Sequence, residues 1–404
     1  MGAPKRGVRG AAAAVRCGND RSESGATVPQ RAWRCRAVSA RRGRARVRSG
    51  GVLPNLVYVG TYTRSGRSEG IYVFRHDPRD GALSQLFTTR MADPSFLAFD
   101  PDQRFLFAVS EGLGRDGGAV ESFRIDPQTG ELSWLSRQPT AGGEPCHLCV
   151  DPSGRWLLVA NHEHGSVAVL PIDADGRLQP MTDLRQHSGS GPGPTQQGPH
   201  AHFVTFDPPR QRVLVCDKGL DQVVVYRLDT ADGRLVPNEP PFGRLHAGAA
   251  PRHLAFHPNG RFVYVNGEAD LTLCACSYDS ATGALSELQH LSTLPPDAAC
   301  DGCSTAQVLV EPTGRWVYVS NRGHDSIASF EIDPSSGRIT AHGHVSTQGR
   351  TPRNFAIDPS GRWLYAANQN SDTIVQFRLD PSSGELEPTG SSTQVGAPVC
   401  ILFS

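Results

Sequence analysis

Asp358-Pro359-Ser360-Gly361-Arg362-Trp363-Leu364-Tyr365-Ala366-Ala367-Asn368 reads as the end of one strand, a tight turn and a second strand. Related phrases stand at residues 100–110, 151–161, 207–217, 257–268 and 311–321, and a seventh copy is split between the two ends of the chain. Self-similarity at a spacing near fifty residues is typical of a repeat architecture, in which each copy forms one structural unit.

Each repeat resolves into four short strands, which we call A, B, C and D in chain order. Strand A is apolar, strand B is of the Arg-Trp-Leu-Tyr type, and strand C alternates apolar and polar residues, as at 372–380. A glycine in every turn before strand D supplies the positive φ that such turns need: Gly81, Gly130, Gly176, Gly233, Gly283, Gly337 and Gly384. Seven such repeats give 28 strands and predict an all-β fold, a seven-bladed β-propeller.

The two ends of the repeat region complement each other. The region begins with a B strand at 56–62 that no A strand precedes, and it finishes with an A strand at 397–403 that no B strand follows. Pairing the N-terminal B strand with the C-terminal A strand builds one blade from both termini. We therefore predict a closed ring with no open sheet edge.

The first fifty residues differ in composition from the rest. Residues 1–50 hold thirteen basic and two acidic side chains, a net charge of +11, so the remaining 27 basic and 38 acidic residues give −11. We interpret 1–50 as a disordered basic extension that does not belong to the native protein, and 51–404 as the propeller. A nucleic-acid-binding arm and an organelle transit peptide are the alternatives.

The predictions of cellular compartment and binding partners rest on the absence of recognisable targeting segments. It has no secretory signal and no run of membrane-spanning length, so the eight cysteines of the body are expected to be reduced thiols. We predict a cytoplasmic protein, monomeric or weakly dimeric, that binds neither nucleic acid nor membrane.

One rim of the predicted ring gathers polar side chains. Strands A and B are antiparallel, so the start of each A strand lies beside the end of its B strand, on one face of the disc. The A-strand starts supply His147, His200, His202, Arg252, Arg353 and Asn354. The B-strand ends supply Glu111, His162, Lys218, Glu268, Asn321, Arg322 and Asn368, of which Glu268, Asn321, Arg322 and Asn368 are the predicted site residues. The opposite turns repeat Asp-Pro-Ser-Gly-Arg, so the polar rim is the predicted binding face.

Several of these residues have more than one interpretation. His200 and His202 could be metal ligands, a base with its neighbour, or interior histidines bonded to backbone. Arg252 and Glu268 could form a structural ion pair, or bind a substrate anion and position water.

Two other clusters have plainer interpretations. We interpret His162-Glu163-His164 as solvated surface, and the Cys300/Cys303 loop as able to pair or to bind metal.

The chain resembles the lactonase family of seven-bladed propellers, which includes propeller-type 6-phosphogluconolactonases and carboxy-cis,cis-muconate cyclases. The resemblance spans about residue 55 to the C-terminus and rests on the phrases at 58–63, 198–202, 251–258, 318–327 and 368–374. It implies a site of one histidine, two arginines and a glutamate, which fall by motif on His202 (or His200), Arg252, Arg322 and Glu268. Relatives usually carry an acid where this chain has Gln307.

The resemblance implies hydrolysis of a sugar lactone, 6-phosphogluconolactone to 6-phosphogluconate, by a lactonase that needs no metal or cofactor. Arg252 and Arg322 would hold the anion of a small anionic lactone and the developing oxyanion, and Glu268 or His202 would activate water. His200, His147, Asn321, Arg353, Asn354 and Asn368 would contact the substrate. The alternatives are a carboxymuconate-lactonising cycloisomerase and a non-catalytic propeller that binds a ligand or protein.

Overall fold

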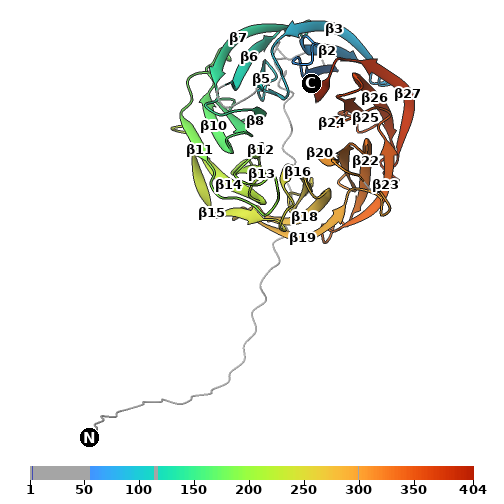
Figure 1. The fold of residues 1–404 in the computed structure, drawn as a ribbon. Coiled ribbons are helices and arrows are strands. Elements are labelled where there is room, and N and C mark those ends of the chain that lie inside the picture. The colour runs from blue at the N-terminus through green and yellow to red at the C-terminus, as the bar shows by residue number, and fades with distance from the viewer. Residues whose placement is uncertain (1, 3–54, 113–116, 299) are drawn as a thin grey trace, which may run out of the picture. The chain divides into compact units, whose positions relative to one another are not determined.

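The computed structural model describes residues 2, 55–112, 117–298 and 300–404. These residues form 28 strands and no α-helix, arranged as seven four-stranded antiparallel sheets. Figure 1 shows the sheets as blades around a common centre, with strands such as β8, β12, β16, β20 and β24 innermost. The prediction of a seven-bladed propeller is confirmed.

Each blade runs outward from its innermost strand. The first three are β28 (Pro398–Phe403), β1 (Leu56–Thr61), β2 (Gly70–His76), β3 (Leu83–Arg90); β4 (Leu97–Phe99), β5 (Phe105–Ser110), β6 (Ala119–Ile125), β7 (Leu132–Pro139); and β8 (Pro145–Val150), β9 (Trp156–Asn161), β10 (Ser166–Pro171), β11 (Asp183–Gln186). The next two are β12 (Ala201–Phe206), β13 (Val213–Asp217), β14 (Gln222–Asp229), β15 (Arg234–Arg244); and β16 (Pro251–Phe256), β17 (Phe262–Gly267), β18 (Thr272–Asp279), β19 (Ala284–Ser292). The last two are β20 (Ser304–Val310), β21 (Trp316–Arg322), β22 (Ser326–Ile332), β23 (Ile339–Ser346); and β24 (Pro352–Ile357), β25 (Trp363–Asn368), β26 (Thr373–Leu379), β27 (Leu386–Gln394).

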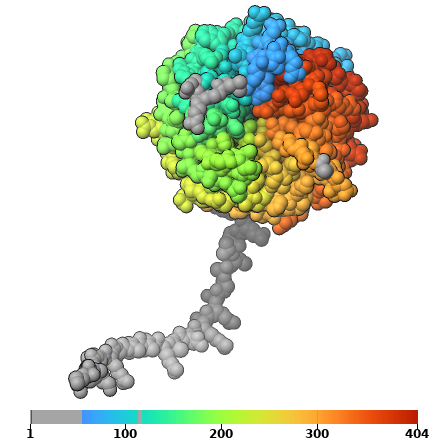
Figure 2. Space-filling view, viewed as in Figure 1, coloured from blue at the N-terminus to red at the C-terminus, as the bar shows by residue number. Residues whose placement is uncertain are grey.

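The two ends of the repeat region close the ring, as predicted. Strand β28 pairs antiparallel with β1, with Tyr58 opposite Leu402 and Val59 opposite Ile401. In the space-filling view the colour runs once around the disc, and the blue N-terminal strands meet the red C-terminal ones (Figure 2). The inner edge of β1 is thereby paired, and no blade is left incomplete.

The core lies between neighbouring blades. Trp316 and Tyr318 of one blade pack with Phe355 and Phe377 of the next, all nearly inaccessible to water. The turn before each D strand packs against the neighbouring blade. At Gly384, whose φ is +74°, the contact is so close that an added Cβ would lie 2.3 Å from the Trp316 ring. The Tyr318 hydroxyl donates a hydrogen bond to the Gly384 carbonyl, which fixes the turn against the neighbouring blade. Glycine is therefore required there by both conformation and space.

Two details differ from the expected pattern. In the third blade the D strand is only Asp183–Gln186, displaced from the turn at 173–178, because Pro180 has no amide to donate to a ladder. Cys300 and Cys303 form a disulfide, which corrects the expectation of reduced thiols for this pair: their turn brings the Cα atoms to 5.5 Å, within bridging range. Cys146, Cys149, Cys216, Cys274, Cys276 and Cys400 are free.

The predicted boundary between residues 50 and 51, with the basic extension before it, lies outside the described residues. Among the residues that the structure describes, no helix is long and apolar enough to cross a membrane.

Ring closure predicts a large effect from one aliphatic side chain. Ile401 is buried between Val59 and the aromatic residues Trp363 and Tyr365 of the next blade. We expect Ile401→Ala to lower the free energy of unfolding by about 2–5 kcal/mol, because it leaves a cavity at the closing seam. Urea unfolding followed by tryptophan fluorescence measures this. Ser391→Ala, on the exposed outer strand β27, is the control and should change it by less than about 0.5 kcal/mol; equal effects would contradict the closing role.

Candidate active site

The starts of the inner strands lie beside the ends of their neighbours, as the sequence predicted. Pro251 pairs with Gly267, Ala201 with Asp217, and Pro352 with Asn368. A cavity of about 200 Å³ opens at this position and draws its lining from six of the seven blades: Glu111, Glu144, Cys146, His162, His202, Lys218, Glu268, Arg322 and Arg353. A cavity shared by so many blades lies on the axis of the ring.

The Glu268 carboxylate is the centre of the charge network. Its Oε1 accepts a hydrogen bond from Lys218 Nζ at 2.5 Å, and its Oε2 lies 2.8 Å from Arg252 Nε and 3.2 Å from Arg322 Nη2. The three cations come from three consecutive blades. Arg252 is 2% exposed and donates to the Ala306 carbonyl, so it supports Glu268 from behind the cavity.

The protonation states of this network follow from burial and charge. Burial alone would raise the pKa of Glu268, but Lys218, Arg322 and Arg252 hold it well below its usual value. Burial and repulsion from Arg322 lower the pKa of Arg252 to about 9, still above neutral pH. The carboxylate is therefore ionised and a weak base, and its neighbours remain cations.

Arg353 differs from the other cations because no carboxylate lies within ion-pair distance of its guanidinium among the described residues. It lies over the Tyr62 ring, with the guanidinium carbon 5.1 Å from the centroid. The nearby Glu111 carboxylate accepts one bifurcated hydrogen bond from the Tyr62 hydroxyl, which lies 2.9 Å from both carboxylate oxygens, and it pairs with Arg64 at 3.3 Å. Arg353 is thus a half-buried cation in the cavity wall with its charge left free.

His162 is a cavity residue, and its interpretation as solvated surface is wrong. Its Nδ1 lies 3.3 Å from Glu144 Oε2, and its Nε2 lies 3.4 Å from Lys218 Nζ. Burial lowers the pKa of His162, while the hydrogen bond to Glu144 opposes that shift. The result is a neutral imidazole oriented by a carboxylate, with Nε2 directed toward the cavity.

The other predicted histidines surround His162 or lie deeper. His202 lines the cavity, and burial together with Arg252 and Lys218 holds its pKa well below the usual value. His200 stacks on His162 with centroids 4.9 Å apart and bonds the His162 carbonyl through Nδ1. His147 is buried between Phe96 and Phe203 and does not reach the cavity.

A second, much smaller cavity of about 10 Å³ lies beneath the first and shares Cys146, His202 and Arg353 with it. Asn354 lines this space and accepts a hydrogen bond from the Ile401 amide. Burial raises the pKa of the Cys146 thiol to about 12, so the one cysteine in the cavity wall is not a thiolate nucleophile.

Asn321 and Asn368 are not brought to the cavity, which corrects their prediction as substrate contacts. Both are fully buried, and their amides donate to the Thr293 and Thr347 carbonyls of the loops that lead into their own blades. Side chains alternate along a strand, so each of these asparagines faces the blade interior while the following residue faces the channel.

That alternation separates the site residues from the other polar residues of the rim, and it identifies those that the sequence placed on the rim but that were not predicted as site residues. One position in each blade lies at or directly after the end of the second strand, as the residue after Asn161 does. In chain order the residues at this position are Tyr62, Glu111, His162, Lys218, Glu268, Arg322 and Gln369. Five of these seven line the cavity. Applying the register of Glu268 to every repeat would have assigned Lys218 and His162 to the site.

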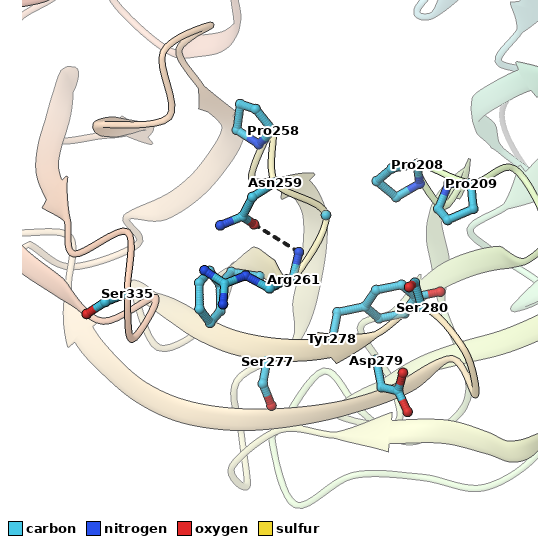
Figure 3. Close-up of a pocket in the computed structure, with 12 residues that line it drawn as sticks. Pro208, Pro209, Pro258, Asn259, Arg261, Ser277, Tyr278, Asp279, Ser280 and Ser335 are labelled. Atoms are coloured by element: carbon cyan, nitrogen blue, oxygen red, sulfur yellow. Dashed lines mark hydrogen bonds between the residues drawn. The ribbon is translucent and has the colours of Figure 1, made fainter. Parts of the chain in front are cut away.

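A larger cavity of about 650 Å³ lies among the turns that follow the inner strands β12 and β16, at the opposite ends of these strands from the axial cavity. Figure 3 shows the residues that line it. Its wall consists of Pro208 and Pro209, the turn from Pro258 to Arg261, and the turn around Tyr278 and Asp279. Asn259 accepts a hydrogen bond from the Arg261 amide, which closes its own turn. No cluster of convergent ionisable groups among the described residues faces this space, so we place the chemistry in the axial cavity.

Comparisons with known proteins agree with this geometry. Residues 56–403 match the family described as "Lactonase, 7-bladed beta-propeller". A 6-phosphogluconolactonase of Bacillus subtilis is 38% identical over 299 residues, which are 74% of this chain and 83% of that protein. A 6-phosphogluconolactonase of Formosa agariphila is 31% identical over 305 residues, 74% of this chain and 85% of that protein.

A solved structure gives the same result. The periplasmic gluconolactonase PpgL of Pseudomonas aeruginosa superposes with a TM-score of 0.81 and 37% identity, over 86% of this chain and 98% of that one. This chain belongs to the lactonase family of seven-bladed β-propellers.

Proposed function

We propose that this protein hydrolyses a sugar lactone, with 6-phosphogluconolactone as the preferred substrate and 6-phosphogluconate as the product. The observation that carries the proposal is the axial cavity, where an oriented neutral histidine faces a cluster of cations. Family membership and relatives named 6-phosphogluconolactonase support it. A cavity of about 200 Å³ suits one small molecule, since drug-sized ligands occupy roughly 300–1,000 Å³.

The charge balance favours a substrate with a negative group. Glu111 is already paired with Arg64, so Lys218, Arg252, Arg322 and Arg353 face only the carboxylates of Glu144 and Glu268, and positive charge is in excess at the cavity. Arg353 is the cation best placed to take a substrate anion, because no carboxylate of the described residues lies within ion-pair distance of it, whereas the other three cations share Glu268. Arg353 therefore binds the phosphate of the substrate, and Arg322 stabilises the oxyanion that forms on the lactone carbonyl.

His162 acts as the general base. Its Nε2 takes a proton from a water molecule, the water oxygen bonds to the lactone carbonyl carbon, and the ring C–O bond then breaks. The proton passes from Nε2 to the departing ring oxygen, which becomes a hydroxyl. Glu144 accepts the Nδ1–H and stabilises the transient imidazolium, while Glu268 is too weak a base and holds the cations in place.

The partners and the compartment remain predictions. The partner is a small anionic lactone, and a monomer or weak dimer in the cytoplasm, bound to neither nucleic acid nor membrane, is still expected. The decisive assay offers the purified full chain 6-phosphogluconolactone, gluconolactone and a carboxymuconolactone. We expect the first to be hydrolysed most efficiently. Activity on the muconolactone alone would favour the cycloisomerase, and no activity on any lactone would contradict the proposal.

Removing the free cation tests the phosphate contact. We expect Arg353→Gln to reduce kcat/KM for the phosphorylated lactone about 10- to 100-fold, mainly through KM, because a hydrogen bond to a charged group contributes roughly 1.5–3 kcal/mol. Steady-state kinetics should show a much smaller change with gluconolactone, which lacks the phosphate. Arg338→Gln, an exposed arginine far from the cavity, is the control. An equal loss with both lactones would rule out a specific phosphate contact.

Replacing the central carboxylate tests its role as counter-ion. We expect Glu268→Gln to lower kcat/KM by at least about 100-fold and the free energy of unfolding by about 3 kcal/mol, because one buried and two partly buried cations lose their partner. Kinetics and urea unfolding measure the two effects. Glu331→Gln, which breaks the exposed ion pair with Arg315, should leave both nearly unchanged. Full stability in the Glu268 variant would refute the counter-ion role.

The pH profile tests the base. The pKa of His162 lies below the usual histidine value of 6.5, and the neutral form is the active one. We therefore expect kcat/KM to be constant near neutral pH and to fall as the pH drops through that pKa. Because the Glu144 hydrogen bond raises the pKa of His162, Glu144→Gln should move this acid limb to lower pH and also reduce the plateau rate. A limb that stays in place in the variant would assign the base elsewhere.

A further inference from the structure

Away from the axial cavity, a second group of ligand-type side chains converges at the rim of the fifth blade. It consists of His246, in the connection from β15 to β16, and Glu287 and His290 on the outer strand β19. One ligand atom from each of the three lies within 4.8 Å of the others. None of them lines the axial cavity.

The distances are those of ligands around one ion. His246 Nδ1 lies 3.1 Å from Glu287 Oε1, and His290 Nδ1 lies 2.6 Å from the same oxygen. Two ligands bound tetrahedrally to zinc at about 2.0–2.1 Å stand roughly 3.4 Å apart, so small side-chain rotations suffice to admit the ion. The two imidazoles are stacked with centroids 3.9 Å apart, so both Nδ1 atoms face the carboxylate from the same side.

A carboxylate behind His246 fixes the orientation that a metal requires. Asp270 Oδ2 lies 2.5 Å from His246 Nε2, and Asp270 Oδ1 accepts a hydrogen bond from the Thr272 hydroxyl. With Nε2–H directed to Asp270, Nδ1 is the nitrogen that faces the Glu287 carboxylate, and an ion that binds there takes the place of the Nδ1 proton. A metal-bound histidine usually has such a partner on its other nitrogen.

The backbone brings Glu287 and His290 to one side although they are three residues apart. A β-bulge shifts the register between Ala275 and Cys276, so one extra residue lies between their pairing positions on β19. Residues three apart on a regular strand face opposite sides, and the bulge removes that difference.

The same bulge elsewhere in the ring carries no ligand pair. The corresponding positions are Gln85 and Thr88 on β3, Trp134 and Arg137 on β7, and Ala341 and His344 on β23. In the second blade they form an ion pair and a hydrogen bond to Glu121 instead. The fold therefore does not require the Glu and His of the fifth blade.

We propose that His246, Glu287 and His290 bind one divalent transition-metal ion, with Zn²⁺ as the best match. Two imidazole nitrogens and one carboxylate oxygen are a zinc donor set with three protein ligands, which leaves the fourth position to water. His290 is 48% exposed, so the ion has a path from solvent. The ion ties the outer strand β19 to the connection that leads into β16, whose second residue is Arg252.

The test is calorimetric titration of the metal-stripped full chain with ZnCl₂, beside the variants Glu287→Gln and His290→Ala. We expect each variant to bind one equivalent of Zn²⁺ fewer than the parent. The control His342→Ala, an exposed outer-strand histidine that packs on Trp316, keeps the full stoichiometry. Counting the lost equivalent separates this site from any binding at the cysteines elsewhere in the chain.

Thermal unfolding provides a second readout. Zn²⁺ should raise the Tm of the parent and of His342→Ala, and it should raise that of the two ligand variants less, because only an ion bound to the folded state stabilises it. Unchanged stoichiometry in both ligand variants, or a parent that binds no Zn²⁺, would overturn the proposal. Neither readout uses lactone hydrolysis, so the result is independent of the proposed activity.

Discussion

A partly buried carboxylate with three cationic neighbours is the interaction on which the axial cavity depends. Lys218, Arg252 and Arg322 come from consecutive blades and would repel one another in a site that excludes most water. Glu268 compensates that repulsion because it forms ion pairs with all three cations, so they can remain close together. The blades place the three side chains close together, and the Glu268 carboxylate offsets the repulsion between their positive charges.

The geometry of the ring explains why one position per blade carries the chemistry. In five of the seven blades the residue after the strand-end position lines the axial cavity. The residue before it points into the sheet and can bond the neighbouring loop, as Asn321 does. The scaffold therefore needs the inner asparagines and leaves the next position free to vary. Tyrosine, glutamate, histidine, lysine and arginine all occur there without disturbing the blades.

Much of the fold could be predicted because it repeats. Seven copies of one phrase identify the blades, and the unmatched strands at 56–62 and 397–403 identify the seam. The Arg252–Glu268 pair followed from the pairing of neighbouring strands.

His162 was missed because His162-Glu163-His164 reads as polar surface when it is viewed alone, and only the common register with Glu268 places it in the channel. The contact with Glu144 joins a loop to a strand end, which no strand periodicity describes. The Asn321 and Asn368 predictions failed because a polar residue at a strand end was taken to face the channel, whereas its amide satisfies a buried carbonyl.

The seam between β1 and β28 has a consequence for how the chain can be engineered. Residue 56 and residue 404 are hydrogen-bonded neighbours, because the Leu56 amide donates to the Ser404 hydroxyl. A short linker could join these points, and new ends could be opened in a surface connection of another blade. Such a circularly permuted chain would retain every blade and every axial side chain, since their positions depend on the closed ring and not on the place where the polypeptide starts.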